Sequence, residues 1–553
     1  MSSENEKSAD AGLPMSPKWD PKKLAAEKAE LRNLETLPLG KRSLGYIKRT
    51  GPGLLQSAMT LGAGSATASV VAGASFGYKL LWVQPLAMFF GVMMLAALSN
   101  VVLTRGERPY KSFGKEIWKP LVFLWALGTI LSSVIWHFPQ YALIAGAGRD
   151  LFAAFGAQLA IPEGGQVPSW IQGISDALTP LGFKVNTSIN TLGYIISLGL
   201  GAFILAMNII VVFNYGKGSK GVKLYERFLR TMIALVIFFF LLVCVLNIKR
   251  VDWLELLKGF TGYYGFPKTN GVVEPNTIMQ VLGMLGAAVG INMTFLYPYS
   301  LLAKGWGEEH KKLARWDLGM TMFVPFTIVT SLIIVAMTVT GVYTGADSVQ
   351  TGLTPLGAAA AFQGIPYGNV IFCLGLIGMC GGAVSVHMVA CGFTMCEMLG
   401  LDMTQKRFRL FALTPCIGFL GVVISLPMWF PIVASAVCFT MLPIAYFIFM
   451  YLNNKRSYIG DAVGKGWKRA VFNIILGLAL IFACIGSGKS IKSNVIDKLA
   501  PPKAPAAETV PAPAVPETPA LDAPAAEEQE APEAAAPEET AAPAEEAAAE
   551  SEN

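Results

Sequence analysis

The chain has 553 residues, of which 53% are hydrophobic and only 14% are charged, and its mean hydropathy is +0.51. A soluble protein carries about 25% charged residues, so this composition excludes an ordinary soluble protein and predicts an integral membrane protein. The formal net charge of +6 comes from basic loops between apolar segments, which argues for a membrane topology and against a nucleic-acid partner.

Eleven apolar stretches are long enough to cross a bilayer as helices, because a hydrocarbon core of about 30 Å requires about 20 residues. We expect an all-α protein with spans at about 54–75, 80–104, 119–145, 191–214, 227–249, 277–303, 320–342, 369–397, 408–428, 430–452 and 467–487. Residues 1–45 are predicted to form a polar arm with a solvated helix near Leu24–Leu34 and no cleaved signal peptide. Residues 46–490 are predicted to form the transmembrane domain. Residues 491–553 should be a disordered tail, because Pro, Ala and Glu cannot build a core.

Lysine and arginine are distributed unevenly between the two sets of loops. Alternate loops hold 26 of them, against seven in the opposite loops before the tail; the basic loops are 41–50, 104–119, 215–230, 303–319, 398–409 and 453–469. The positive-inside rule then predicts a cytoplasmic N-terminus. Eleven spans would place the C-terminal tail outside a plasma or inner membrane.

The first span contains a weak point, in the sequence GPGLLQSAMTLGAGSATASVVAGAS. Gly62 and Gly64 interrupt it, and glycine is the poorest helix former after proline. Irregular backbone at bilayer depth is tolerated only where it is buried in protein or lines a cavity. Unwinding here would direct carbonyl groups of the first half-helix, N–H groups of the second, and the hydroxyls of Ser65 and Thr67 at a site. A packing face of small residues is the alternative.

The sixth span contains a second weak point. Gly290 permits a break, Asn292 places an amide at mid-membrane, and Pro298 follows. Breaks in corresponding helices of two halves are the best sequence indication of the substrate site of a secondary transporter. Because a buried Asn must be hydrogen-bonded, Asn292 is expected to contact either the substrate or the first span.

Two histidines lie inside predicted spans, His137 in the third and His387 in the eighth. Ionisable groups within a membrane are functional by default, so each is a candidate proton or polar relay, with a neutral packing role as the alternative. Cys380, His387 and Cys391 share one face of the eighth span, which permits a soft-metal stripe, although nearby methionines favour packing. All eight cysteines lie in predicted spans, so no disulfide framework is expected.

The chain resembles the Nramp family of divalent-metal transporters over most of residues 45–455. The resemblance rests on Gly51-Pro52-Gly53, Phe76 to Val83, Leu285 to Val289, Cys391 to Glu397 and Leu442 to Ala445. It implies a LeuT-type fold in which spans 1–5 (about 51–250) and 6–10 (about 277–452) form inverted repeats, with an extra helix at about 467–487. It also implies alternating access and a divalent metal ion bound between the broken first and sixth spans.

The residues at the family's motif positions differ from the family pattern. Gly62-Ala63-Gly64-Ser65 replaces Asp-Pro-Gly-Asn, and Gly290-Ile291-Asn292-Met293 replaces Met-Pro-His-Asn, while Ser435 stands where a tenth-span Gln is expected. The substrate contacts that the resemblance implies are therefore Gly62, Gly64, Ser65, Thr67, Ala287, Gly290, Asn292 and Ser435, without the usual Asp, Asn and Met ligands.

This donor set leaves three functions open. Transition metals favour carboxylate, imidazole or sulfur ligands, and Mg²⁺ and Ca²⁺ usually take at least one carboxylate. The first candidate is therefore a metal carrier that moves a partly hydrated ion. The second is a carrier of a small organic or anionic solute bound at the half-helix N-termini, and the third is a non-transporting sensor. The sequence shows no nucleophile–base pair or phosphate loop, so neither an enzyme nor a cofactor is expected.

Overall fold

The computed structural model describes residues 21–492, apart from 163–164, 182–183, 216–218, 275–276, 341–361, 363–366, 425–437 and 439. The chain divides into two units, Met1–Leu499 and Ala500–Asn553, and every described residue belongs to the first. Ser435, the first part of the expected tenth span and the predicted disordered tail lie outside the described residues.

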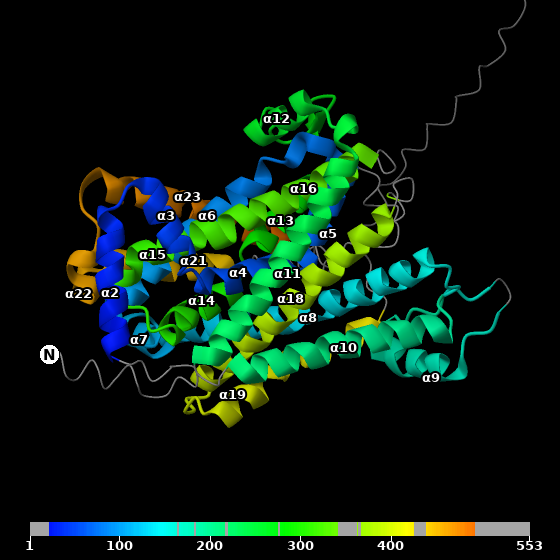
Figure 1. The fold of residues 1–553 in the computed structure, drawn as a ribbon, viewed down its shortest axis with the longest axis horizontal. Coiled ribbons are helices and arrows are strands. Elements are labelled where there is room, and N and C mark those ends of the chain that lie inside the picture. The colour runs from blue at the N-terminus through cyan, green and yellow to red at the C-terminus, as the bar shows by residue number, and fades with distance from the viewer. Residues whose placement is uncertain are drawn as a thin grey trace, which may run out of the picture. The chain divides into compact units, whose positions relative to one another are not determined.

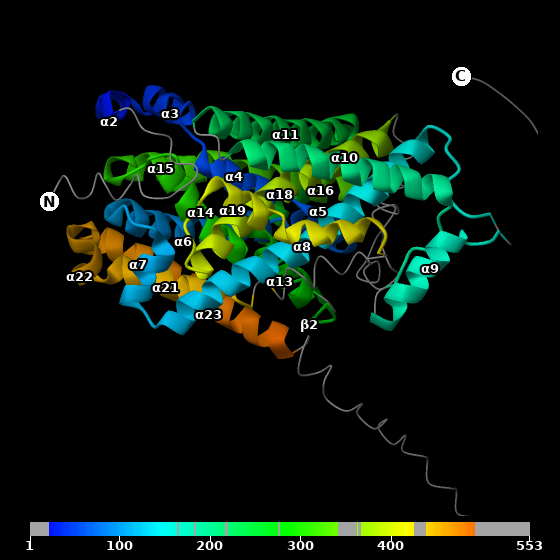
Figure 2. The ribbon, with the colours of Figure 1, turned by 90° about the horizontal axis from the view of Figure 1, so that it is seen from below.

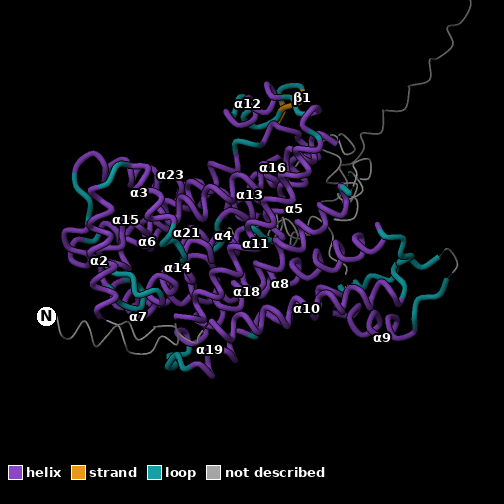
Figure 3. The backbone as a smooth tube through the Cα atoms, viewed as in Figure 1, coloured by secondary structure: helices purple, strands orange, loops and turns teal. Residues whose placement is uncertain are grey.

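The described part of the chain is mostly helical (Figure 1). Its α-helices are α2 (Pro21–Thr36), α3 (Leu39–Ile47), α4 (Pro52–Thr60), α5 (Ala63–Phe76), α6 (Val83–Arg105), α7 (Pro109–Glu116), α8 (Lys119–Ala154), α9 (Ser169–Leu178), α10 (Thr191–Tyr215), α11 (Ser219–Leu246), α12 (Trp253–Thr261), α13 (Thr277–Ala288), α14 (Ile291–Ala303), α15 (Lys311–Leu318), α16 (Val324–Thr340), α18 (Gly368–Met398), α19 (Gln405–Ala412), α21 (Leu442–Asn454), α22 (Arg456–Ile459) and α23 (Gly466–Ile491). A small antiparallel hairpin, β1 (Lys268–Thr269) and β2 (Val272–Val273), lies near α12 (Figure 3).

Eight segments of the described residues are long and apolar enough to cross a membrane. They are Val83–Arg105, Lys119–Ala154, Thr191–Tyr215, Lys223–Leu246, Thr277–Ala303, Glu308–Thr340, Gly368–Met398 and Gly466–Lys489. The expected first span consists of two shorter helices, α4 and α5, and α21 covers the second part of the expected tenth. The prediction of an all-helical, multi-pass membrane protein is confirmed, whereas the number of eleven spans stays a prediction.

Both predicted helix breaks are present. Between α4 and α5, Leu61 has φ −80° and ψ 73°, and Gly62 is extended with φ −139°. Between α13 and α14, Gly290 is extended with φ −91° and ψ 161°. The first and sixth spans are therefore each two half-helices, as the glycines indicated.

The two broken spans run antiparallel and meet at their breaks. At one end, Gln280 of α13 donates a hydrogen bond to the carbonyl of Ala68 in α5. In the middle, the Thr60 hydroxyl of α4 donates to the carbonyl of Ala288 at 3.2 Å. At the other end, Lys304, directly after α14, donates to the carbonyl of Thr50 at 3.2 Å. This arrangement brings four helix ends to one place inside the bundle.

A buried carboxylate holds the start of α4. Asp317 of α15 is fully buried and accepts hydrogen bonds from the backbone N–H groups of Gly51 at 2.9 Å and Gly53 at 2.6 Å. A carboxylate is favourable here because the first N–H groups of a helix have no partner within it. The adjacent pair of Lys304 with Glu226, 2.8 Å apart, ties the same region to α11. The first half of the broken span is thus anchored at the end remote from its break.

The predicted basic loops lie on one side of the bundle. Ion pairs connect them across the sequence: Lys28–Glu309, Lys312–Glu35, Lys304–Glu226, Arg108–Glu397 and Lys455–Glu116. α2, α3, α7, α15 and α22 gather at this end in Figures 1 and 2. Most of the described side chains of α2 are exposed, as expected for a solvated helix, although its Leu31 is buried. The basic loops that were predicted to lie on one side of the membrane therefore lie at the same end of the bundle.

The expected ninth span differs from an α-helix. It consists of α19 followed by a 3₁₀-helix at Thr414–Val422, in which residues three apart lie on one side. Gly418 and Gly421 are such a pair, and they meet α8. A Cβ on Gly418 would lie 2.3 Å from the Cβ of His137, and one on Gly421 would lie 2.2 Å from the carbonyl oxygen of Phe138. This close approach explains why these two residues are glycines.

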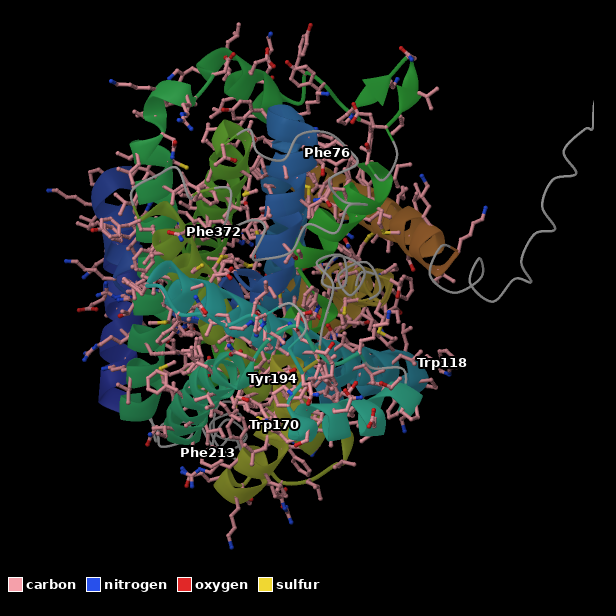
Figure 4. The ribbon with its side chains drawn as sticks, turned by 90° about the vertical axis from the view of Figure 1, so that its right-hand side faces the viewer. Phe76, Trp118, Trp170, Tyr194, Phe213 and Phe372 are labelled. Atoms are coloured by element: carbon pink, nitrogen blue, oxygen red, sulfur yellow. The ribbon has the colours of Figure 1, made fainter. Side chains whose placement is uncertain are left out.

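The far end of the bundle is covered by short elements. α9 packs on the start of α10 through Trp170 and Tyr194, whose ring centroids lie 5.1 Å apart (Figure 4). α12 and the hairpin cover the start of α6, where the backbone N–H of Trp82 donates to the carbonyl of Gly259 at 3.0 Å. Several apolar side chains of α12 are exposed. This end of the bundle therefore presents apolar side chains, whereas the opposite end presents basic ones.

Candidate functional site

A small cavity lies where the two breaks meet. Its volume is about 30 Å³, and its wall comes from both broken spans, α8 and α18: Met59, Thr60, Gly62, Gly64, Ser65, Trp136, Gln140, Gly286, Ala287, Gly290, Asn292, Met293 and His387. A single water needs about 10–15 Å³ by this measure. The cavity therefore has room for about two water molecules or one ion that has lost most of its hydration shell.

The first break is closed by its own serine. The Ser65 hydroxyl donates to the carbonyl of Thr60 at 2.6 Å and accepts from the backbone N–H of Gly62 at 3.3 Å. These bonds satisfy a carbonyl and an N–H that the break removes from the helical pattern. Ser65 thus supports the bend while also lining the cavity.

Gln140 of α8 supports the same break from outside the broken span. Its Oε1 atom accepts a hydrogen bond from the backbone N–H of Ala63 at 2.9 Å. A Cβ on Gly62 would lie 2.7 Å from the Nε2 atom of Gln140 and 3.0 Å from the Cβ of Ala383 in α18. Gly62 is therefore required by this close approach, since its extended backbone is open to other residues.

A thioether occupies the second break. The Sδ atom of Met293 accepts a hydrogen bond from the backbone N–H of Gly290 at 3.3 Å and lies 3.4 Å from the hydroxyl of Thr60. The last carbonyl groups of α13, including that of Ala287, have no partner within their own helix. This side of the cavity therefore offers sulfur and carbonyl oxygen.

Asn292 links the cavity to a pair of histidines. Its Oδ1 atom accepts from the backbone N–H of Met293 at 3.0 Å, which directs its Nδ2 atom toward Nδ1 of His387, 3.1 Å away. Because Nδ2 is a donor, Nδ1 of His387 must accept, and the proton of the neutral ring lies on Nε2. The ring of His137 follows, with its centroid 5.5 Å from that of His387. Nδ1 of His137 lies 3.3 Å from the carbonyl of Ser133, and its Nε2 has no partner among the described residues.

The sequence and fold of this chain are similar to those of known membrane transporters. A family model described as natural resistance-associated macrophage protein-like matches residues 184–487, which is more than half of the chain. The chain belongs to the Nramp family. Among curated relatives of this Nramp protein, the divalent metal cation transporter MntH of Brucella suis is 21% identical over 469 residues, covering 80% of this chain and 89% of the relative. The metal transporter nramp1 homolog of Dictyostelium discoideum is 24% identical over 460 residues, covering 78% and 73%.

Solved structures agree on the fold of this Nramp protein. A crystal structure of the Eremococcus coleocola manganese transporter aligns with a TM-score of 0.59 and 14% identity, covering 85% of this chain and 91% of that one. Another structure of the same transporter, bound to an aromatic bis-isothiourea substituted compound, aligns with a TM-score of 0.58. The family and these neighbours are transporters, so the expectation that this chain is not an enzyme is confirmed.

The structure of this Nramp protein brings most of the predicted site residues together. Gly62, Gly64, Ser65, Ala287, Gly290, Asn292 and His387 line the cavity. Thr67 lies outside the lining, because its hydroxyl turns back along α5 to the carbonyl of Ala63 at 2.8 Å. His137 lies behind His387, and Ser435 lies outside the described residues.

Sequence reasoning missed part of the wall of the Nramp cavity. Met59, Trp136, Gln140 and Gly286 were not singled out, and Met293 was treated only as a replaced motif residue. Trp136 and Gln140 are four residues apart and so share a face of α8. This spacing is the one sequence feature that could have identified them as lining residues. The described lining contains no carboxylate, lysine or arginine side chain. The described residues contain no cluster of three His, Cys, Asp or Glu side chains suited to a metal ion. All eight cysteines are free thiols.

Proposed function

We propose that the protein is a secondary transporter that carries a metal cation across the membrane by alternating access. The cation would bind in the cavity between the breaks at Gly62 and Gly290. The observation that carries this proposal is the meeting of the two breaks around a cavity of about 30 Å³. Pockets for organic ligands usually measure about 300–1,000 Å³, so the volume favours an ion over the alternative of an organic solute. Membership of the Nramp family supports the same choice.

The uncharged wall limits which ions can bind tightly. A divalent ion stripped of water needs opposite charge close by, because desolvating an unpaired charge is costly. Carbonyl, amide, hydroxyl and thioether groups supply lone pairs but no formal charge. The substrate would therefore be a divalent ion that keeps some of its water, or an ion of lower charge. In the proposed orientation the basic loops and the N-terminus face the cytoplasm, and the tail lies outside.

Uptake into proteoliposomes tests the assignment. We expect Mn²⁺, Co²⁺ or Mg²⁺ to enter vesicles that contain the full chain, and Asn292→Ala to abolish uptake because it removes the amide that links the cavity to His387. Asn208→Ala is the matched control, since Asn208 is also a buried amide but bonds to the carbonyl of Ile204 in its own helix at 2.8 Å. If no metal ion enters, the assignment as a metal carrier is wrong. Metal binding without uptake would support the sensor alternative.

A second candidate substrate is a soft monovalent metal ion. Met59 and Met293 place two thioethers in the cavity wall, and thioether sulfur selects Cu⁺-like ions over Mg²⁺ or Mn²⁺. A single positive charge also suits a wall without a carboxylate. Replacing both methionines by leucine conserves volume, and each replacement should cost less than about 1.5 kcal/mol of stability. We expect this double variant to lose protection by Ag⁺ in a thermal-shift assay; undiminished protection would exclude the thioether site.

We also propose that His387 and His137 form the predicted relay. His387 of α18 lines the cavity, and the ring of His137 of α8, whose Nε2 has no partner among the described residues, lies next to it. His137→Gln retains a polar side chain but cannot carry a proton at neutral pH. If the pair carries protons, this variant should uncouple metal uptake from the acidification of the vesicle lumen. Unchanged proton movement would leave only a packing role for the pair.

A further inference from the structure

A second cavity, which shares no lining residue with the cavity between the breaks, lies at the side of the bundle. Its volume is about 360 Å³, and its wall is formed by α6, α13 and α23 with part of the hairpin loop. The wall is almost wholly apolar, with Leu86 and Phe90 from α6, Leu282 and Leu285 from α13, and Phe482 and Ile485 from α23. Among the described lining residues, Lys489 is the one with a charge. An elongated apolar ligand with an anionic head matches this distribution.

Lys489 lies at the same end of the cavity as the start of α6. The rings of Phe90 and Phe482 stack with centroids 5.9 Å apart. Ten residues farther along α6, Asn100 bonds to Asn453 at 2.8 Å, and Asn454 in turn bonds to Asn473 near the start of α23. α6 therefore runs toward the basic end of the bundle and α23 runs away from it. The two helices run in opposite directions. The end of α23, with Lys489, therefore lies beside the start of α6, with Val83.

The neighbouring helix α12 indicates that this end lies at the level of lipid headgroups. Trp253, Leu254 and Leu257 are each about 60% exposed, at 61%, 63% and 59%. A helix with exposed Trp and Leu and with charged residues on its other face lies in the plane of the membrane interface. α12 is fixed to the cavity because Trp82, which lines it, bonds to the carbonyls of Gly259 and Gly265.

We propose that this cavity binds an anionic phospholipid, with an acyl chain between α6, α13 and α23 and the headgroup phosphate on Lys489. The long side chain of Lys489 can follow the apolar wall and still place its ammonium group in the headgroup layer. The three lining helices each belong to a segment long enough to span the membrane, and α23 lies at the edge of the bundle, where lipid can reach it (Figure 4). The bound chain would contact Leu285, two residues before Ala287 of the ion cavity.

Native mass spectrometry of the full chain tests this site without measuring transport. The protein is released from mixed micelles that contain phosphatidylglycerol and phosphatidylcholine with the same acyl chains. We expect phosphatidylglycerol to be retained preferentially, and Lys489→Gln to reduce that preference about fivefold, the contribution of one basic residue near an anionic surface. Lys468→Gln, at the opposite end of α23, is the matched control and should leave the preference unchanged.

A second variant tests the apolar part of the site. Leu282→Trp fills the cavity and should reduce retention of both lipids, whereas Leu478→Trp, on an exposed part of α23, should not. If Leu282→Trp fails to fold, Lys489→Gln still decides the proposal. Equal retention of the two lipids by the unmodified chain, or an unchanged preference in Lys489→Gln, would overturn it. Retention of a free fatty acid in place of phospholipid would overturn the choice of occupant.

Discussion

Adding a single methyl group at Gly62 should disturb both the stability and the function of the protein. The backbone of Gly62 is extended, a conformation that alanine adopts freely, so any effect arises from contacts. The added Cβ would lie 2.7 Å from Nε2 of Gln140 and 3.0 Å from the Cβ of Ala383. Ala383 has no rotamer by which to move away. Gln140 must therefore shift, and its bond to the N–H of Ala63 is then lost.

The expected cost follows from these two contacts. Overpacking a buried site costs about 1–3 kcal/mol, and leaving a buried N–H without a partner costs about 1–3 kcal/mol. Because relaxation of Gln140 relieves the first while causing the second, we expect Gly62→Ala to lower the free energy of unfolding by about 3 kcal/mol. Metal uptake should fall as well, since Gln140 and Gly62 both line the cavity.

Thermal unfolding in detergent and uptake in proteoliposomes measure the two effects. Gly199→Ala is the matched control, because Gly199 lies within α10 and a Cβ there meets nothing within 4 Å. That change should stabilise the protein by about 0.5–1 kcal/mol, because alanine is the better helix former. In a double-mutant cycle, Gln140→Ala should recover part of the stability lost by Gly62→Ala. If Gly62→Ala matches Gly199→Ala in both assays, the assigned packing of the break is wrong.

Three other substitutions test contacts away from the cavity. Asp317→Ala should lower stability by about 3 kcal/mol, because it leaves two buried N–H groups of the first span unpaired; hydrogen exchange should then accelerate in α4, and unchanged protection there would refute the anchor. Glu397→Ala should cost about 3–5 kcal/mol, because it leaves Arg108, 2.6 Å away, without its partner; thermal unfolding should show a smaller loss when Arg108 is also replaced. Gly418→Ala should lower the unfolding temperature, whereas Gly477→Ala, where a Cβ meets nothing within 4 Å, should not; equal effects would contradict the close packing of the 3₁₀-helix.

The sequence predicted the position of the site because the physical cause is local. Gly62 and Gly290 weaken their helices wherever these helices are placed, so the breaks and the residues beside them could be found without a structure. The pairing of the two breaks followed from their places in the first and sixth spans, which correspond in the two halves of a transporter, and the family resemblance agreed with it.

The remaining wall depends on packing between helices that are distant in sequence. Gln140 and Met59 lie on helices that are buried around most of their circumference, so hydrophobic periodicity does not identify the face that meets the cavity. The ninth span was expected to be an α-helix because its apolar run has the right length. Its 3₁₀ geometry accompanies the close approach of Gly418 and Gly421 to the backbone of α8, which sequence spacing alone does not show.

The anchored first half of span one has a mechanical consequence. α4 has nine residues and is therefore about 13 Å long, with a joint at the break at one end and Asp317 at the other. A rotation of about 10° around that joint moves the far tip by about 2 Å, which is enough to carry both carboxylate bonds beyond hydrogen-bonding range. α4 therefore cannot tilt about the break by this amount while its first N–H groups stay bonded to Asp317.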